Sequence, residues 1–345
     1  MIETPQHQFY GGTANGGLYG YGTIFKMSKA GKTTLINSFD NVDGQNPTNG
    51  VIQGSNGILY GTTEYGGDGY NYSWAGILFE LNKKKETVLD QFADDGFSPD
   101  DPNGVIADAQ GNLYGVATGG GADDAGFIFE YNTAGHMSVL YTFTGGSDGF
   151  GPQGPLVWGP DGDLYGVTVW GGVNGVGNVF KMDTSGNLTT LHSFASGTTD
   201  GYYPNPGSLA FDAAGNIYGT TYYGGTGTAC SHECGTVFKV TPSGSESLVY
   251  SFQGGTGGGY PITGVTLDSK GNIYGTASSY GDPTCGCGVL FSLNSAGTET
   301  VLHTWTGSDG SYPSGQLLLA GGGLYGLTSN GGTSNDGVAF LWSAK

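Results

Sequence analysis

The chain has few charged residues, and basic residues are the scarcest of all. Only 10 of its 345 residues are lysine or arginine, against 29 aspartates and glutamates, so the formal net charge is −19. Proteins that bind nucleic acid draw most of their affinity from contacts between basic side chains and phosphate. We therefore expect neither nucleic acid nor an anionic membrane as a partner. A weakly charged acidic surface suits an extracellular protein that meets neutral ligands.

Long apolar runs are also missing from the sequence. No 18 consecutive apolar residues occur, so no transmembrane helix and no membrane insertion are predicted. The first five residues lack the basic start and the apolar stretch of a signal peptide. If the natural product is secreted, we expect this chain to be its mature or trimmed form.

Cysteine is rare, and its four copies form two close pairs, Cys230 with Cys234 and Cys285 with Cys287. Disulfides that staple loops in an oxidising compartment are the favoured interpretation, although four cysteines allow three pairings. One alternative is a zinc site of four thiolates with His232 beside them, but these spacings are not those of zinc knuckles. Free thiols are a further alternative.

What the chain does contain is glycine, at 70 of 345 positions, together with a sustained repeat. A branched aliphatic residue, a tyrosine and a glycine recur as a triplet, with the glycines 51 to 56 residues apart. The six triplets begin at Leu59, Leu113, Leu164, Ile217, Ile273 and Leu324. A period of this length across a whole chain indicates a repeat architecture.

One repeat, residues 154–194, contains four short strands in sequence. We predict strand A over 154–158, strand B over 164–170, strand C over 178–182 and strand D over 188–194. All four are rich in β-branched and aromatic residues, show no helical period, and are separated by glycine-containing turns. Four antiparallel strands in a unit of about 50 residues describe one blade of a β-propeller. The predicted fold class is therefore an all-β propeller.

The number of strand C segments favours seven blades. Each has a phenylalanine three residues after a glycine, at Phe25, Phe79, Phe129, Phe180, Phe238, Phe291 and Phe340. The first unit lacks strand A and the last stops at strand C, so we expect incomplete terminal blades over 1–49 and 315–345. Six blades are the alternative, with the N-terminal strand D completing the last blade. No linker or change in composition divides the chain, which predicts a single domain over 1–345.

The repeat motif is fullest over residues 217–239, which contain Ile-Tyr-Gly-Thr-Thr, then Gly-Gly, then Gly-Thr-Val-Phe-Lys. Over nearly the whole chain this pattern resembles the bacterial GloVer tandem repeat of choice-of-anchor β-propeller proteins. The resemblance implies a secreted or surface-anchored bacterial protein whose activity is largely unassigned. It implies no catalytic residue.

The loops between strands B and C vary most in length, so they are the natural place to look for a site. The longest, residues 64–75, combines four aromatic rings with small polar residues. Flat rings can stack on sugars while neighbouring polar groups bond the hydroxyls. The candidate ligand-binding residues are Tyr65, Tyr70, Tyr72, Trp74, Trp170, Tyr223 and Tyr280.

The loops between strands D and A carry a second repeated mark, Asp-Gly-x-x-Pro. It occurs at Asp43, Asp95, Asp148, Asp200 and Asp309, with aromatic residues inside it. The favoured interpretation is that the aspartates shape turns and the aromatic rings pack between blades. A ring of shallow binding sites is the alternative. The oxygens of Asp95, Asp100 and Asp101 also make calcium a candidate ligand, without an EF-hand spacing; we expect no other cofactor.

Catalytic candidates are few. His232 and Glu233 form a candidate acid–base pair, and Glu64 is a candidate carboxylate for a glycosidase mechanism. His192 and His303 occupy equivalent places in strand D and are interpreted as structural. No nucleophile elbow, zinc-binding helix or phosphate loop is present.

These observations predict a secreted or cell-surface bacterial β-propeller that acts as a binding or adhesion module. Its expected partner is a neutral glycan bound through aromatic-rich loops, or a surface protein. A polysaccharide lyase or glycoside hydrolase that uses the same loops is the alternative function. A structural envelope protein is the third.

Overall fold

The structure is a computed structural model that describes residues 1–47, 49–67, 76–93, 100–205, 207 and 209–343. The chain forms two compact units. Unit 1 consists of Met1–Leu156 and Thr184–Leu188, and unit 2 consists of Val157–Asp183 and Thr189–Lys345. Each unit is built from antiparallel sheets whose strands follow one another in chain order.

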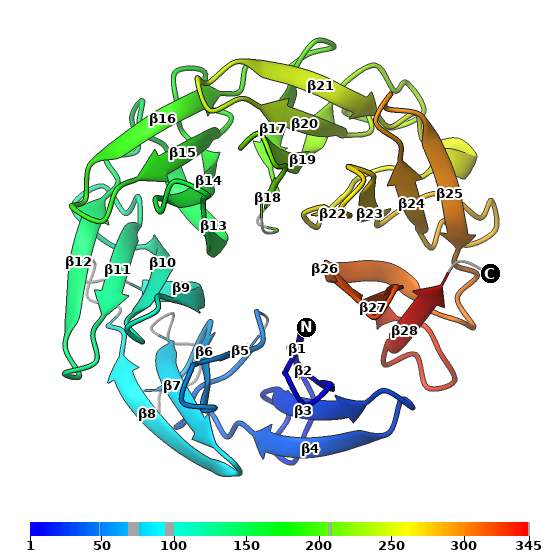
Figure 1. Cartoon of the computed structure of the whole chain (residues 1–345). Helices are drawn as coiled ribbons and strands as arrows, with labels where there is room; N and C mark the ends of the chain where they lie inside the picture. The colour runs from blue at the N-terminus through cyan, green and yellow to red at the C-terminus, as the bar shows by residue number, and fades with distance from the viewer. Residues whose placement is uncertain (48, 68–75, 94–99, 206, 208, 344–345) are drawn as a thin grey trace. The chain divides into compact units, whose positions relative to one another are not determined.

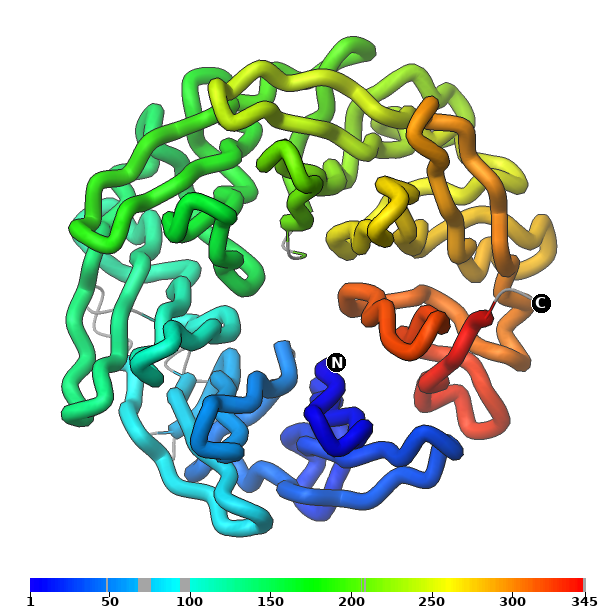
Figure 2. Tube along the Cα trace, viewed as in Figure 1, coloured from blue at the N-terminus to red at the C-terminus, as the bar shows by residue number. Residues whose placement is uncertain are grey.

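Unit 1 contains three four-stranded sheets. Their strands are β1 (Ile2–Glu3), β2 (Gln8–Thr13), β3 (Thr23–Ser28) and β4 (Thr33–Ser38); β5 (Ile52–Gln53), β6 (Leu59–Thr63), β7 (Ile77–Asn82) and β8 (Lys85–Gln91); and β9 (Asp100–Ala107), β10 (Leu113–Gly119), β11 (Phe127–Tyr131) and β12 (Met137–Thr142). Within this unit the sheets follow one another along an arc, with the last strand of each on its outer side (Figure 1). The Cα trace shows the same meander three times (Figure 2).

The fourth sheet draws its residues from both units, and unit 2 contains the remaining three sheets. The strands are β13 (Phe150–Trp158), β14 (Leu164–Trp170), β15 (Asn178–Met182) and β16 (Leu188–Ser193); β17 (Gly201–Pro204), β18 (Ala210–Phe211), β19 (Ile217–Gly224), β20 (Thr236–Val240) and β21 (Glu246–Ser251); β22 (Thr266–Leu267), β23 (Ile273–Ala277), β24 (Val289–Leu293) and β25 (Glu299–Thr304); and β26 (Ser311–Ala320), β27 (Gly323–Asn330) and β28 (Val338–Ser343). In the fifth sheet β17 and β18 both pair with β19, so together they form strand A. In the described part of the chain the one helical segment is the 3-10 turn η1 (Gly255–Gly257), and no helix there is long and apolar enough to cross a bilayer.

The chain is thus an all-β, seven-bladed propeller, and the six-bladed alternative is wrong. The first blade also differs from its prediction, because β1 supplies a strand A that pairs Ile2 with Tyr10 and Glu3 with Phe9. A strand of two residues is too short to show an alternating pattern. The last blade ends with strand C, β28, among the described residues. That the whole chain is one domain stays a prediction.

The glycine of each triplet is required by a phenylalanine on the neighbouring strand. In the third sheet Gly115 on β10 pairs with Phe129 on β11. A Cβ atom at Gly115 would lie 2.5 Å from Cζ of Phe129, so only glycine leaves room for the ring. The same glycine–phenylalanine pairing recurs in the other blades, for example Gly219 with Phe238. The predicted close approach at this glycine is confirmed.

The aromatic residue that closes strand D packs against the strand C phenylalanine of the next blade. In each case the rings meet edge to face, with centroids 5.1 or 5.2 Å apart. The pairs are Phe39–Phe79, Phe92–Phe129, Phe194–Phe238, Phe252–Phe291 and Trp305–Phe340. Phe340 is half-buried and the other rings are buried, and burying one such side chain stabilises the fold by about 1.5–3 kcal/mol. Repetition of one contact therefore joins successive blades.

The tyrosine of the triplet has two roles. Its hydroxyl donates to the aspartate of the turn between strands A and B, as Tyr165 does to Asp161 at 2.8 Å and Tyr218 does to Asp212 at 3.1 Å. Its ring also packs towards the next blade, where Tyr165 meets Phe211 edge to face at 5.0 Å. The tyrosine thus contributes to the turn as well as to the predicted inter-blade packing.

Candidate functional site

Where strand D of one blade leads into strand A of the next, one residue directly before a proline lies in the left-handed backbone region, at six places among the described residues. The residues with this conformation are Asn46, Asp101, Gly151, Tyr203, Tyr260 and Tyr312. Their backbone N–H groups reach the loop of the preceding blade: Tyr260 N–H donates to the carbonyl of Cys234 at 2.8 Å, and Tyr312 N–H to that of Cys287 at 3.0 Å. The repeat therefore holds the loops of adjacent blades together and presents one side chain at each junction. We call this residue the pre-proline residue.

In the fifth and sixth blades these junctions carry a cluster of tyrosines. The tyrosine cluster consists of Tyr202, Tyr203, Tyr222, Tyr223, Tyr260 and Tyr280, all half-buried and all in unit 2. Tyr222 stacks on Tyr260 with ring centroids 5.0 Å apart and an angle of 18° between the planes. Tyr223 meets Tyr222 edge to face at 4.6 Å. These contacts form one continuous aromatic surface.

The remaining rings extend this surface on both sides. Tyr202 lies 5.3 Å from Tyr203 and 5.3 Å from Tyr223, and at the other end Tyr280 lies 6.0 Å from Tyr260. Tyr280 also donates its hydroxyl hydrogen to the backbone carbonyl of Ala229 at 3.0 Å. Each ring is thus held by at least one neighbour, which reduces the entropy that a ligand would have to remove on binding.

A short disulfide loop lies against the tyrosine cluster. Cys230 and Cys234 are bonded, and the three residues between them contact the tyrosines. Ser231 N–H donates to the hydroxyl oxygen of Tyr260 at 3.1 Å. The ring of His232, which is exposed, meets Tyr223 edge to face at 5.3 Å.

The structure settles the pairing of all four cysteines. The second disulfide joins Cys285 to Cys287, and the described chain has no free cysteine. The two alternatives, a zinc site of thiolates and free thiols, are therefore wrong, because every sulfur is bonded to another sulfur.

Burial raises the pKa of two hydroxyl groups in the cluster. Burial, reinforced by the negative charge of Glu233, raises the pKa of Tyr202 to about 12. The Tyr202 hydroxyl also donates a hydrogen bond to Oε2 of Glu233 at 3.4 Å. Burial raises the pKa of Tyr222, with smaller contributions from Tyr223 and Tyr260. The surface therefore offers aromatic rings, phenol hydroxyls and one carboxyl group.

Four of the residues singled out in the sequence meet at this cluster: Tyr223, Tyr280, His232 and Glu233. The other four tyrosines were visible in the sequence, but only as repeated aromatic residues near the turns. The sequence could have located two of them, because Tyr203 and Tyr260 directly precede the repeated proline. Whether these residues bind a ligand stays a prediction.

The equivalent junction between the second and third blades, in unit 1, contains carboxylates instead. Glu64 accepts a hydrogen bond from the hydroxyl of Tyr65 at 2.7 Å and another from the amide of Asn46. Burial raises the pKa of Glu64, and burial with the nearby charges of Glu64 and Asp100 raises the pKa of Asp101 to about 8. The structure thus brings three predicted site residues, Glu64, Tyr65 and Asp101, into one neighbourhood.

In the third blade the repeated proline is Pro102. Pro102 pairs with Ala117, just as Pro204 pairs with Thr221 in the fifth blade. Asp101 is therefore the pre-proline residue of this blade. The mark predicted at Asp95 lies outside the described residues.

Several predicted residues lie elsewhere. Tyr70, Tyr72, Trp74 and Asp95 are outside the described residues. Asp100 is buried at the start of β9, and the calcium prediction that includes it stays a prediction.

Trp170 ends β14 and is 40% exposed, at the position that Tyr223 holds in β19. Its role in binding a ligand also stays a prediction.

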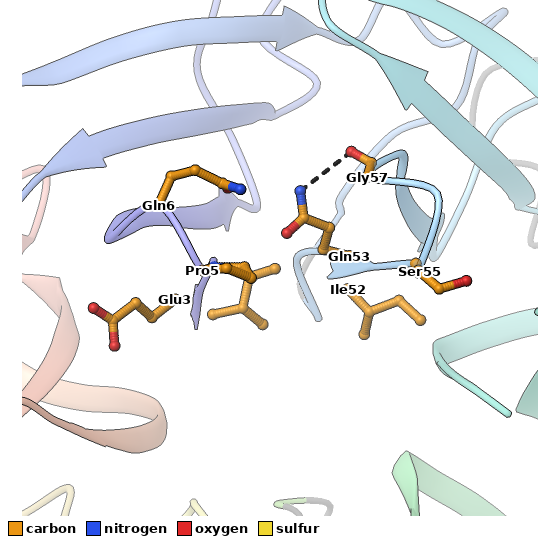
Figure 3. Close-up of a pocket in the computed structure, with 9 residues that line it drawn as sticks. Glu3, Pro5, Gln6, Ile52, Gln53, Ser55 and Gly57 are labelled. Carbon is orange, nitrogen blue, oxygen red and sulfur yellow. Dashed lines mark hydrogen bonds between the residues drawn. The ribbon is translucent and has the colours of Figure 1, made fainter. Parts of the chain in front are cut away.

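A hollow of about 480 Å³ lies in unit 1, between the first two blades. Figure 3 shows the side chains of Pro5, Gln6 and Gln53 around it, with the amide of Gln53 donating to the carbonyl of Gly57 at 3.2 Å. Glu3, the one charged residue of its lining, is paired with His7 at 2.8 Å. The lining contains no aromatic ring, so this hollow lacks the stacking surface that the tyrosine cluster has.

The fold and its loops define a β-propeller built from tandem repeats of about 50 residues. The sequence matches the profile of the Gloeobacter/Verrucomicrobia repeat over residues 1–231 and 214–344, so the chain belongs to this family. The resemblance to the GloVer repeat is thereby confirmed. No curated protein matches the sequence.

Several solved structures share the fold at low sequence identity. The extracellular domain of BT4673 from B. thetaiotaomicron is 12% identical, with a TM-score of 0.59, over 99% of this chain and 39% of that one. PorZ, a surface component of the type-IX secretion system of Porphyromonas gingivalis, is 14% identical, with a TM-score of 0.59, over 99% and 46%. Puromycin hydrolase is 12% identical, with a TM-score of 0.59, over 94% and 49%. The chain spans less than half the length of each, and these likenesses concern the fold alone.

Proposed function

We propose that this protein is an extracellular carbohydrate-binding module whose ligand contacts the tyrosine cluster of the fifth and sixth blades. The observation that carries the proposal is the continuity of the six rings, which contact one another through centroid distances of 4.6 to 6.0 Å. Aromatic rings with polar tips are favoured at binding surfaces because one part is apolar and another can hydrogen-bond.

The chemistry of the cluster suits a neutral sugar. The rings supply flat apolar faces for the C–H groups of a pyranose, and the hydroxyls with Glu233 supply donors and acceptors for its hydroxyl groups. The net charge of −19 disfavours an anionic polymer, and the cluster has no lysine with which to bind one. The ligand class supported best is therefore a neutral glycan.

An extracellular location is supported by the two disulfides, which persist in oxidising environments and are rare in the cytosol. Two of the proteins that share the fold are an extracellular domain and a surface component. A surface protein bearing such a glycan is an equally suitable partner for the same tyrosine surface.

The proposal is tested with a glycan array and two matched variants. Tyr260→Ala removes the stacked ring of the cluster, whereas Tyr312→Ala removes a tyrosine with the same backbone conformation before Pro313, outside the cluster. We expect Tyr260→Ala to weaken binding of the best glycan about 10-fold or more, and Tyr312→Ala to leave it unchanged. Binding of no glycan, or equal losses in the two variants, would contradict the proposal.

A second candidate, a polysaccharide lyase, is favoured by one contact. The His232 ring lies against Tyr223, which places a base and a phenol in one exposed site. Incubation with uronic-acid polysaccharides, followed by the absorbance of unsaturated products, tests this function. Activity that disappears in His232→Ala would support the lyase, and absence of product with every polymer would contradict it.

A further inference from the structure

A second kind of site lies at the outer edge of the blades, where strand D of one blade meets strand D of the next. Three positions of the repeat meet there. The first is the residue two before the aromatic residue that closes strand D, and the second is the aspartate position of the loop that follows. The third is a residue at the start of strand D in the next blade. The described copies with a glutamate at the third position are Asn37, Asp43 and Glu86; His192, Asp200 and Glu246; and Tyr250, Gly257 and Glu299.

In two copies the first residue of the trio donates a hydrogen bond to the glutamate. The Asn37 amide donates to Oε2 of Glu86, and the Tyr250 hydroxyl donates to Oε2 of Glu299 at 2.7 Å. The repeat thus joins adjacent blades through a neutral donor and a carboxylate, which satisfies Oε2 of the glutamate, while Oε1 of Glu86 and Oε1 of Glu299 are buried without a partner among the described residues.

The copy formed by His192, Asp200 and Glu246 departs from this arrangement. His192 Nε2 is directed to Oδ2 of Asp200, 3.2 Å away, and not to Glu246. Oε1 of Glu246 is buried and has no hydrogen-bond partner among the described residues. This copy therefore places an imidazole and a second carboxylate beside a glutamate that accepts no hydrogen bond among the described residues, whereas Glu86 and Glu299 each accept one through Oε2.

The first two groups are held firmly in place. The His192 ring packs edge to face on Phe194 with centroids 4.8 Å apart, which fixes the direction of Nε2. The backbone N–H groups of Ala195 and Gly201 donate to the two oxygens of Asp200 at 2.9 and 2.7 Å. Asp200 is only 7% exposed, and its Oδ2 contacts both Ala195 N–H and His192 Nε2, so a metal ion would take the place of the His192 contact.

We propose that His192, Asp200 and Glu246 bind a zinc ion that links β16 to β21. Their ligand atoms lie within 4.8 Å of one another, and a tetrahedral zinc with ligands at about 2.0–2.2 Å requires separations of about 3.4 Å. A rotation of the Glu246 side chain would bring its carboxylate oxygen to the shorter separation that zinc requires. Binding displaces the proton between His192 and Asp200, and imidazole with two carboxylates is a donor set that suits zinc. A solvent molecule completes the coordination.

The test measures zinc bound to the full chain after dialysis against micromolar ZnCl₂, by elemental analysis and by titration calorimetry. Glu246→Gln keeps the shape of the side chain and removes its charge. His303→Gln is the matched control, because His303 pairs with Asp309 at 2.9 Å in the same way but no following strand D exists among the described residues to supply a third ligand. Far-UV circular dichroism establishes that each variant is folded.

We expect one zinc per wild-type chain and per His303→Gln chain, and at least a 10-fold weaker affinity in Glu246→Gln and in His192→Gln. Zinc should also raise the Tm of the wild type but not that of Glu246→Gln, because a ligand that binds only the folded state stabilises it. The proposal is overturned if the wild type binds no more zinc than Glu246→Gln, or if His303→Gln loses as much zinc as His192→Gln.

Discussion

The junction between the second and third blades and the junction between the fifth and sixth blades have the same backbone and opposite chemistry. Glu64 and Tyr222 occupy the same position relative to the triplet, and Asp101 and Tyr260 are both pre-proline residues with φ of 54° and 55°. In unit 1 the two positions hold carboxyl groups, and burial together with the nearby charge of Glu64 raises the pKa of Asp101 to about 8. In unit 2 they hold two stacked rings 5.0 Å apart.

This comparison shows that the repeat fixes where a side chain is presented and leaves its chemistry open. The proline and the left-handed residue before it serve the backbone alone, so they recur whatever the side chain. Asp101 is tolerated there because its protonated form carries no charge, and Tyr260 because its ring finds another ring. A site can thus arise at one junction of the propeller without any change in the fold.

The largest change in stability is expected when the two acidic residues of the unit 1 junction replace the two tyrosines of the unit 2 junction. The double substitution Tyr222→Glu and Tyr260→Asp should lower the free energy of unfolding by about 3 kcal/mol at pH 8, because it removes a stacked pair and places two carboxylates at partly buried positions. The loss should be smaller at pH 5, where the carboxyl groups take up protons. Guanidinium denaturation at both pH values measures it, with Tyr222→Phe and Tyr260→Phe as the control. Equal losses at the two pH values would show that charge plays no part.

A smaller effect, of opposite sign, is expected for Asp101→Asn. The pKa of Asp101 is raised from 3.8 to about 8 in the folded protein, so its contribution to stability is complete below about pH 4 and is lost as the pH rises through 8. Asparagine carries no charge at any of these pH values, so the variant does not lose this stability. Its free energy of unfolding should exceed that of the wild type by about 1 kcal/mol at pH 9 and equal it at pH 4. Urea denaturation across this range is the measurement.

Asp108→Asn is the control for that experiment. Burial opposes ionisation of Asp108, but hydrogen bonds from Asn112 and from backbone N–H groups outweigh it and lower the pKa. Its ionised form is therefore stabilising, and the variant should be less stable than the wild type at pH 9. A gain in stability for both variants would mean that net negative charge alone, and not the junction, causes the effect.

The smallest change in stability is expected when a single hydroxyl group is removed from the tyrosine cluster. The Tyr260 hydroxyl accepts a hydrogen bond from Ser231 N–H at 3.1 Å, whereas the Tyr222 hydroxyl has no such partner among the described residues. Tyr260→Phe should cost about 0.5–1 kcal/mol of unfolding free energy, and Tyr222→Phe should cost less than about 0.5 kcal/mol. Thermal unfolding of the two variants compares them. A larger loss of unfolding free energy for Tyr222→Phe than for Tyr260→Phe would contradict the assignment of Tyr260 as the residue that holds the disulfide loop.

Much of the fold could be predicted from the sequence because its signals are local. The Asp161-Gly162 turn and the alternation around Leu164 placed strand B over the residues of β14, and the glycine three residues before each phenylalanine marked strand C. Short or interrupted segments carried no such signal. The two residues of β1 were missed for that reason.

The candidate site was less predictable because its residues come from different loops. Tyr222 and Tyr260 are 38 positions apart in the sequence (260 minus 222) and meet only when the fifth and sixth blades pack. The repeated aromatic residues of the loops were interpreted as packing groups, which is true of their ring contacts. No local pattern shows that six of them share one surface.

The sequence by itself determined the blade, because each strand and turn depends on residues within about 50 positions and recurs with the same period. It also determined the net charge of −19, on which the prediction of no nucleic-acid partner rests. Only the tertiary structure decided which cysteines pair, which tyrosines stack and where Glu246 is left without a donor. Those outcomes depend on distances between side chains of neighbouring blades, and packing sets these distances after the local structure has formed.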